Sequence, residues 1–593
     1  MNLSRRTVLT ALPAAAGVLG LGACSSGGTA SQASATASSQ APTDPKLTLD
    51  SAAWRYDATG DVYYQLGLSY VATPQASDYE TLGIYVPGAY FTGTDNGNGT
   101  YTATINASGA VGSFTAATAP TVLPVNTPGY SAQKPPSEYS YDTIKAYMEA
   151  GFIYVHAGLR GKDSNSQTYS GNAPWGVTDL KAAVRYRRYN AASIPGDAAK
   201  VYVFGHSGGG AQSAVAGASG DSGLFAPYLA ALGAATTDTS GKALSDAVAG
   251  AMCWCPITTL DSANAAYEWN MGQFASSGTR AEGTWTRAYS QDLAAAFPAY
   301  LNELKLTDSD GKPLSLESSS KGTYLAGSYY DHLVAVIQKS LNDFLSATSF
   351  PYTPSSTEMA GMGPGGGGAP SGGGPDGQSS SETTTYNTVE EYIASLNSSS
   401  RWVAYDASTN TATITGLEGF VTSQKNASKD VGAFDGVDRA QTENLVMGSG
   451  ENKLHFSSSS REVISKGQSK YSALSGWSND YGVAAYEKDL AAKDSVGTDM
   501  ATRVSMYDPL YYLTQDSKGR GTSIIAPAWR IRTGITQGDT ASTVEVNLAL
   551  ALQQAGAGSV DFATIWGQGH TMAELTGTGE ENFIAWVTQQ ATS

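Results

Sequence analysis

The chain has 593 residues, a formal net charge of −17 and a pI near 4.7. This acidic balance argues against nucleic acid as a partner and suits an exported protein. Three cysteines exclude a disulfide-rich scaffold, so stability must come from the burial of apolar side chains.

The first 24 residues are interpreted as a targeting signal. Ser4-Arg5-Arg6 is a twin-arginine motif, and an apolar run from Ala11 to Leu21 follows it. The run ends at Cys24 in a sequence that resembles the lipobox of bacterial lipoproteins, so we expect Cys24 to carry lipid and residues 25–45 to form a disordered tether. The alternative is a plain signal peptide with an incidental cysteine. From this signal we expect a protein exported by the twin-arginine route, extracytoplasmic and either anchored by lipid to the bacterial cell membrane or secreted. No later stretch is apolar for long enough to span a bilayer.

Runs rich in β-branched and aromatic residues alternate with helical patterns along the rest of the chain. A helical pattern at 179–188 comes shortly before the run at 201–204, as a βαβ crossover requires. We predict an α/β fold with a mostly parallel, doubly wound sheet, whose core is split between residues 46–220 and 505–593. Residues 221–504 are then an inserted lid region, and its Gly-rich loop 359–384 is too poor in apolar residues to pack. Strands are predicted at 81–86, 152–156, 201–204, 250–255, 529–533 and 560–566.

The segment 205–209, Gly-His-Ser-Gly-Gly, has the form of a nucleophile elbow between a strand and a helix. Its glycines allow the sharp turn that lifts the Ser207 hydroxyl above the sheet, and the following helix points backbone N–H groups at an oxyanion. The alternative is an ordinary Gly-rich turn. An oxyanion hole also needs a second N–H beside that of Gly208, and Gly88 or Ala89, after an early strand, is the predicted donor.

Cys253 and Cys255 are predicted to be buried free thiols, because a disulfide between residues two apart on one strand would be strained. The sequence places no third soft ligand nearby, so we expect no metal site there.

Five histidines leave one candidate for a general base. His206 stands beside Ser207 and cannot reach its hydroxyl in base geometry. His156 precedes the nucleophile, which is the wrong chain order for an α/β-hydrolase, and two others lie in the insertion. His570, which follows the last predicted strand and precedes a closing helix, is therefore the predicted base.

Asp539 is the predicted triad acid, on the loop after the strand at 529–533. It would orient His570 and stabilise the imidazolium. Alternatively, Asp539 caps the helix that starts near Thr540. Asp261 is a competitor, since some members of the fold carry the acid one strand earlier.

Several segments jointly resemble bacterial tannases and their feruloyl-esterase-like relatives, the tannases of subtype B in particular, over nearly all of the mature chain. The resemblance implies an α/β-hydrolase with a large inserted lid. The segments are 85–91, 158–161, 173–176, 205–210, 255–258, 266–269, 529–534 and 569–571.

The resemblance also implies roles in substrate binding. In these tannases a lysine and a glutamate of the lid bind the hydroxyls of the galloyl ring, and Lys429 and Glu443 stand in similar segments; the alternative is a solvated pair of charges. The family pattern Asp-x-Asp-Thr has one aspartate for the triad and one for the substrate, whereas residues 537–540 read Gln-Gly-Asp-Thr. Asp539 must then either orient His570 or meet the substrate.

We therefore expect an exported serine carboxylic-ester hydrolase in which Ser207 attacks, His570 moves the proton and Asp539 holds His570. The reaction passes through an acyl-enzyme and needs no cofactor. The expected substrate is a small phenolic ester, a gallate or a hydroxycinnamate. The alternatives are a serine peptidase of the same fold, which the lack of propeller repeats disfavours, and a catalytically inactive ligand-binding surface lipoprotein.

Overall fold

The computed structural model describes residues 44–354 and 384–593. The predicted signal peptide with Cys24, nearly all of the predicted tether and nearly all of the Gly-rich loop lie outside the described residues. Within the described ranges, no helix has the length and apolar character needed to cross a membrane.

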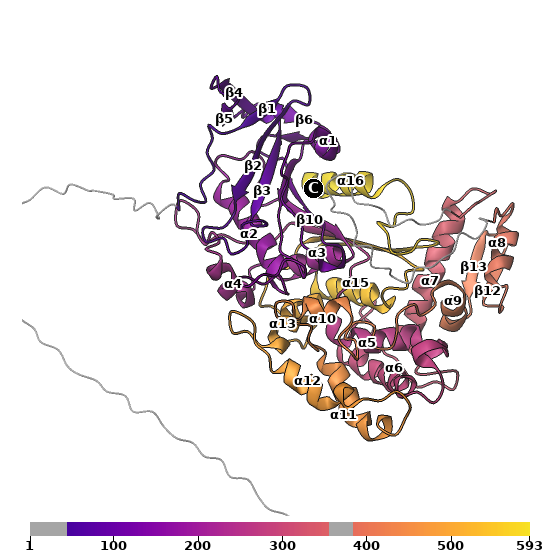
Figure 1. Cartoon of the computed structure of the whole chain (residues 1–593). Coiled ribbons are helices and arrows are strands. Elements are labelled where there is room, and N and C mark those ends of the chain that lie inside the picture. The colour runs from indigo at the N-terminus through magenta and orange to yellow at the C-terminus, as the bar shows by residue number, and fades with distance from the viewer. Residues whose placement is uncertain (1–43, 355–383) are drawn as a thin grey trace, which may run out of the picture. The chain divides into compact units, whose positions relative to one another are not determined.

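A nine-stranded sheet forms the core (Figure 1). Its strands are β1 (Arg55–Asp57), β2 (Val62–Ser69), β3 (Thr81–Pro87), β8 (Thr121–Val125), β9 (Ile153–Ala157), β10 (Val201–His206), β11 (Gly250–Trp254), β14 (Ala528–Gly534) and β15 (Ser559–Ile565). Their order in space is β1-β2-β3-β9-β8-β10-β11-β14-β15. The pairs from β1 to β9 are antiparallel and all later pairs are parallel. The predicted α/β fold with a mostly parallel sheet is confirmed.

The central strand β8 is absent from the sequence-based prediction. All five of its residues are buried, so no alternation of polar and apolar residues marks it. It also contains Pro124, and a proline argues against a central strand because it cannot donate to the ladder. Because β8 lies beside β10, the loop that follows β8 lies next to the end of β10.

Helices connect and cover the strands. The predicted helix at 179–188 is part of α2, and the predicted closing helix is part of α16. The helices that connect and cover the strands are α1 (Tyr141–Glu149), α2 (Trp175–Tyr189), α3 (Gly208–Ala218), α4 (Ala226–Ala231), α15 (Thr543–Ala555) and α16 (Gly579–Thr592).

The insertion begins later than the sequence suggests. Strand β11 lies inside the range 221–504 that was assigned to the insertion, yet it pairs with both β10 and β14 of the main sheet. The boundary is therefore corrected to a point after Trp254, because the insertion separates β11 from β14 along the chain.

The helices α5, α6, α11 and α12 of the insertion pack together and are grouped in Figure 1. The elements of the insertion are α5 (Leu260–Asn270), α6 (Trp285–Glu303), α7 (Ser328–Ala347), α8 (Val389–Leu396), β12 (Val403–Asp406), β13 (Thr411–Ile414), α9 (Leu417–Gln424), α10 (Thr442–Val446), α11 (Ser458–Tyr471), α12 (Val483–Leu490), α13 (Met500–Met506) and α14 (Pro509–Leu513).

A buried ion pair ties the end of β9 to α2. Asp179 accepts three hydrogen bonds from Arg160, from the backbone N–H at 2.8 Å, Nε at 2.9 Å and Nη2 at 2.7 Å. Both side chains are fully buried, and the guanidinium lies 4.2 Å from the ring of Trp175. Loss of Arg160 would leave Asp179 uncompensated away from water, whereas loss of Asp179 would leave the guanidinium with Glu80 alone, whose Oε1 lies 3.4 Å from Nη2.

We expect Asp179→Asn to lower the free energy of unfolding by about 3–5 kcal/mol, because it breaks this buried pair. The matched control is Asp78→Asn, which breaks an exposed pair with Lys134 of 3.8 Å and should cost less than about 1 kcal/mol. Urea unfolding of the three proteins measures both values. Equal losses for the two variants would contradict the role of the buried pair.

Candidate active site

Ser207 lies at a strained turn between β10 and α3. Its φ is 59° and its ψ is −121°, a conformation that residues with side chains rarely adopt. A Cβ atom on Gly209 would lie 1.9 Å from the carbonyl oxygen of Val125, and one on Gly205 would lie 2.5 Å from the carbonyl carbon of Gly209. Only glycines fit at these two positions, so the close packing of α3 on β8 explains the spacing of the motif.

His570 reaches Ser207 from the loop after β15. Its Nε2 lies 2.8 Å from Oγ of Ser207, although 363 positions separate the two residues in the chain. The thiol of Cys255 donates to the carbonyl of Thr571 at 3.3 Å and so holds the adjacent residue. The structure thus brings together the predicted nucleophile and the predicted base, in hydrogen-bonding geometry.

Gln537 occupies the hydrogen-bonding position that was predicted for Asp539. Its Oε1 lies 2.7 Å from Nδ1 of His570, whereas Oδ2 of Asp539 lies 3.7 Å from the same nitrogen, within ion-pair distance. The predicted role of Asp539 as the acceptor that orients His570 is therefore corrected, and Gln537 takes this position. Gln537 is buried where the chain leaves β14, while Asp539 stands two residues later and is about one-third exposed. Asp539 is not the cap of α15 either, since that position belongs to Ser542.

Two buried groups fix the side-chain amide of Gln537. Its Nε2 donates to Oε1 of Glu545 at 2.6 Å and to Oγ1 of Thr533 at 2.6 Å. Oγ1 of Thr533 donates its proton to the same oxygen of Glu545 at 3.2 Å, so both partners present lone pairs to the amide nitrogen, and the amide oxygen faces His570. Nδ1 of His570 then carries the ring proton, and Nε2 presents the lone pair that accepts a proton from Ser207.

Lys425 completes the buried cluster. Its Nζ donates to the backbone carbonyl of Gln537, and its side chain is 2 % exposed. Burial raises the pKa of Glu545 and lowers the pKa of Lys425, and the attraction between the two charges opposes both shifts. A lysine from the insertion therefore contacts the loop that positions the base.

Gly88 lies at the wrong edge of the sheet, so its predicted role as an oxyanion donor is wrong, and the same holds for Ala89. Strand β3 runs antiparallel to β9, which places the end of β3 opposite the edge at which β10 ends. The N–H of Gly88 also donates to the carbonyl of Asp61 at 2.6 Å.

The loop beside the elbow is instead the one that follows β8, which contains the short helix η2 (Pro128–Tyr130). A Cβ on Gly208 would lie 2.5 Å from the carbonyl oxygen of Thr127 and 2.5 Å from the backbone nitrogen of Tyr130. Gly208 is the first residue of α3, so its N–H has no acceptor within the helix and is placed for an oxyanion. The apolar run of β8 is the signal that would have located this loop.

Asp261, the competing acid, faces the insertion. Its carboxylate accepts from the backbone N–H of Ser458 at 2.6 Å and from Oγ of Ser459 at 2.8 Å. It is therefore used to attach α11 to α5.

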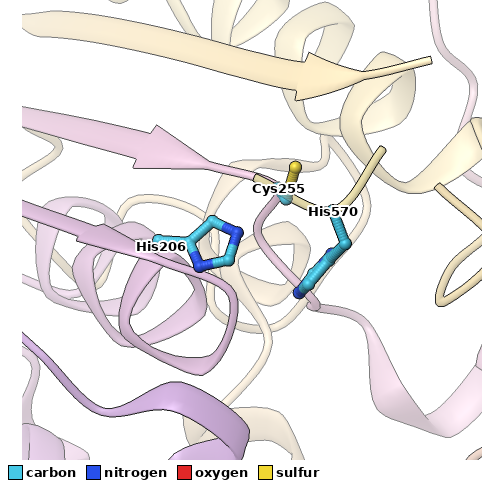
Figure 2. A group of neighbouring side chains, drawn as sticks. All are labelled: His206, Cys255 and His570. Carbon is cyan, nitrogen blue, oxygen red and sulfur yellow. The ribbon is translucent and has the colours of Figure 1, made fainter. Parts of the chain in front are cut away.

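His206, Cys255 and His570 form a group of metal-ligand type, whose ligand atoms lie within 4.8 Å of one another (Figure 2). Both nitrogens of His570 already contact Ser207 and Gln537. Burial raises the pKa of the Cys255 thiol to about 12 and lowers the pKa of His206 to about 3, so both are neutral at pH 7. We interpret the group as neutral packing around the base. Cys253 and Cys255 are buried free thiols, as predicted.

Glu443 lies within electrostatic range of both Lys429 and Asp539. Burial raises the pKa of Glu443, Lys429 opposes that shift and Asp539 reinforces it. Glu443 is 4 % exposed, so it is not half of a solvated pair. Oγ of Ser428, next to Lys429, donates to the carbonyl of Gly538 at 3.1 Å, which joins this segment of the insertion to the loop of Asp539.

We expect Gly534→Ala to reduce kcat about 100-fold, because the new Cβ would lie 1.8 Å from the carbonyl oxygen of Gly569 and displace the loop of His570. Gly223→Ala is the control, since no atom lies within 4 Å of the Cβ built there. Hydrolysis of a p-nitrophenyl ester measures both variants. Unchanged kcat in folded Gly534→Ala would contradict the proposed tight fit of this loop.

Comparisons with known proteins agree with this geometry. The family model described as BD-FAE matches residues 113–266, which include the elbow. The native tannin acyl hydrolase from Lactobacillus plantarum is 26% identical, with 92% of this chain and 99% of that chain covered and a TM-score of 0.64, and the tannin acyl hydrolase in complex with 3,4-dihydroxybenzoate has the same values. Fusobacterium nucleatum tannase is 24% identical over 89% of this chain and 95% of its own, with a TM-score of 0.63. The comparison with curated proteins finds no match. The chain is thus tannase- and feruloyl-esterase-like, with an α/β-hydrolase fold that carries a large insertion.

Proposed function

We propose that this chain is a serine carboxylic-ester hydrolase that acts on small phenolic esters. The observation that carries the proposal is the 2.8 Å contact between Oγ of Ser207 and Nε2 of His570 at a strained elbow. An inactive binding protein has no need for a strained serine in contact with an oriented histidine.

The proposed reaction follows from these contacts. The hydroxyl proton of Ser207 passes to Nε2 of His570 while Oγ bonds to the ester carbonyl carbon, and the N–H of Gly208 stabilises the oxyanion. The imidazolium then gives its proton to the departing alcohol as the ester C–O bond breaks, which leaves an acyl-enzyme. Water, deprotonated by His570, then attacks the acyl carbon, and the imidazolium returns this proton to Oγ of Ser207 as the acyl C–Oγ bond breaks and the acid leaves. Asp539, 3.7 Å from Nδ1, stabilises the imidazolium by its charge.

The phenolic substrate class is supported by the likeness to tannin acyl hydrolases, which have been solved with 3,4-dihydroxybenzoate and with ethyl gallate. In this chain Asp539 lies 3.7 Å from Nδ1 of His570, and Glu443 lies within electrostatic range of Asp539 and of Lys429. We propose that Lys429 and Glu443 bind the hydroxyls of the aromatic ring. The twin-arginine motif and Cys24 support export and lipid anchoring as part of the same proposal.

The first test is a panel of p-nitrophenyl acetate, methyl gallate, methyl ferulate and a peptide anilide, with wild type and Ser207→Ala without the leader. We expect turnover of the esters, with a preference for a phenolic acyl group, and a loss of at least about 10⁴-fold in Ser207→Ala. Labelling by a fluorophosphonate should disappear in the same variant. Turnover of the anilide alone would indicate a peptidase, and folded wild type that neither labels nor turns over would indicate a binding protein.

The role of the lid charges is tested with Glu443→Gln. We expect KM for methyl gallate to rise about tenfold, because a hydrogen bond to a charged group contributes about 1.5–3 kcal/mol. The kinetics on p-nitrophenyl acetate should not change, since acetate has no ring hydroxyl. Equal effects on both esters would assign Glu443 to the stability of the site rather than to recognition.

A further inference from the structure

We propose that Glu545 is a positioning residue of the reaction, which holds His570 in its proton-accepting tautomer through the side-chain amide of Gln537. The inference rests on the proposed function and deepens its mechanism. It follows from one connected line of contacts, from Ser207 through His570 and Gln537 to Glu545, in which each hydrogen bond measures 2.6–2.8 Å.

The orientation of the amide decides whether His570 is a base. If the Gln537 amide were turned over, its NH₂ group would face Nδ1, and Nδ1 would have to accept a hydrogen bond. The ring proton would then lie on Nε2, which could no longer accept from Ser207. Glu545 opposes this state, because the amide oxygen would face its carboxylate oxygen. Oγ1 of Thr533 lies 3.2 Å from the same carboxylate oxygen and donates to it, so it presents its lone pairs to the amide nitrogen.

Glu545 also supplies the charge that a neutral amide lacks. The imidazolium that forms in the reaction is stabilised by a negative charge beyond Nδ1, and Gln537 carries none. Gln537 and Thr533 are each 3 % exposed and Glu545 is 0 % exposed, so the charge of the carboxylate acts through a medium of low dielectric constant. Its hydrogen bond to the amide polarises the amide oxygen toward His570.

Burial raises the pKa of Glu545 to about 7, and the charge of Lys425 opposes this shift and favours the ionised form. Lys425 is the cation that faces it, and Cys255 and Tyr329 face it as well. Burial raises the pKa of the Cys255 thiol and of the Tyr329 hydroxyl, so both are neutral and add no competing charge. The cation comes from the segment just after α9, within the insertion.

The decisive variant is Glu545→Gln, which keeps the size of the side chain and removes its charge. We expect kcat on p-nitrophenyl acetate and methyl gallate to fall about 10- to 100-fold with KM unchanged, because the substrate does not touch residue 545. The matched control is Glu80→Gln, the same exchange in another fully buried carboxylate, which accepts from the N–H of Ala76 at 2.7 Å. Its kcat should stay within about twofold of wild type.

The pH profile separates a charge from a packing role. As the pH falls, protonation of Glu545, whose pKa is raised by burial, and protonation of His570 both lower kcat in the wild type. Glu545→Gln cannot undergo the first of these two protonations. Its kcat should therefore be lower than that of the wild type at high pH and should fall less steeply as the pH is lowered. A variant that only loosened packing would keep the wild-type pH dependence.

The strongest test exchanges the two groups, as Gln537→Glu with Glu545→Gln. The carboxylate at position 537 then accepts from Nδ1 of His570, and the amide at 545 donates to that carboxylate. Gln537→Glu alone sets two carboxylates side by side, so one must take up a proton and kcat should fall. We expect kcat of the double variant to be at least about tenfold higher than kcat of the less active of the two single variants.

Recovery in the double variant supports the proposal, whereas additive losses, or wild-type kcat and pH profile in Glu545→Gln, would overturn it. If Glu545→Gln does not fold, the double variant compared with Gln537→Glu alone gives the same decision. Fluorophosphonate labelling of wild type reports on the proposed function separately, since its absence would remove the esterase whatever residue 545 does.

Discussion

The site depends on the close approach between the start of α3 and the end of β8. The backbone of Gly209 lies against the carbonyl of Val125 with no room for a side chain, and this contact forces Ser207 into its positive-φ conformation. The same approach brings the loop that contains η2 against Gly208. One packing constraint therefore sets both the backbone conformation of the nucleophile and the place at which negative charge can be stabilised.

The insertion takes part in positioning the base. Its segment from Lys425 to Lys429 contacts the loop of Gln537 through Lys425 and Ser428, so core and insertion share the group that positions the base. The buried Lys425 and Glu545 come from the two sides of this contact. The two opposite charges compensate each other away from water, so the interface between core and insertion contains a buried pair of charges as well as apolar contacts.

The sequence was sufficient where a pattern is local. The elbow, the six strands with clear apolar runs and the loop of His570 follow from spacing and chain order, and the structure places Ser207 and His570 in contact. Prediction from the sequence failed where a residue's role depends on residues that are close in space but distant along the chain. Strand β8 was not predicted because it contains Pro124, and without β8 the loop of Gly88 was the nearest candidate for the oxyanion donor. Gln537 was passed over because carboxylates are the usual partners of a base, whereas its amide gains that role from Glu545, eight residues later.

The distance along the chain between the two reacting side chains has a consequence for biosynthesis. Ser207 and His570 are 363 positions apart, so β15 and its following loop are made long after the elbow. A nascent chain that has already folded the elbow and most of the sheet holds an alcohol without a base. Under the proposed mechanism, hydrolytic activity therefore begins only when β15 adds to the edge of the sheet, so a polypeptide cut short before β15 is inert toward esters while it retains the other strands of the sheet.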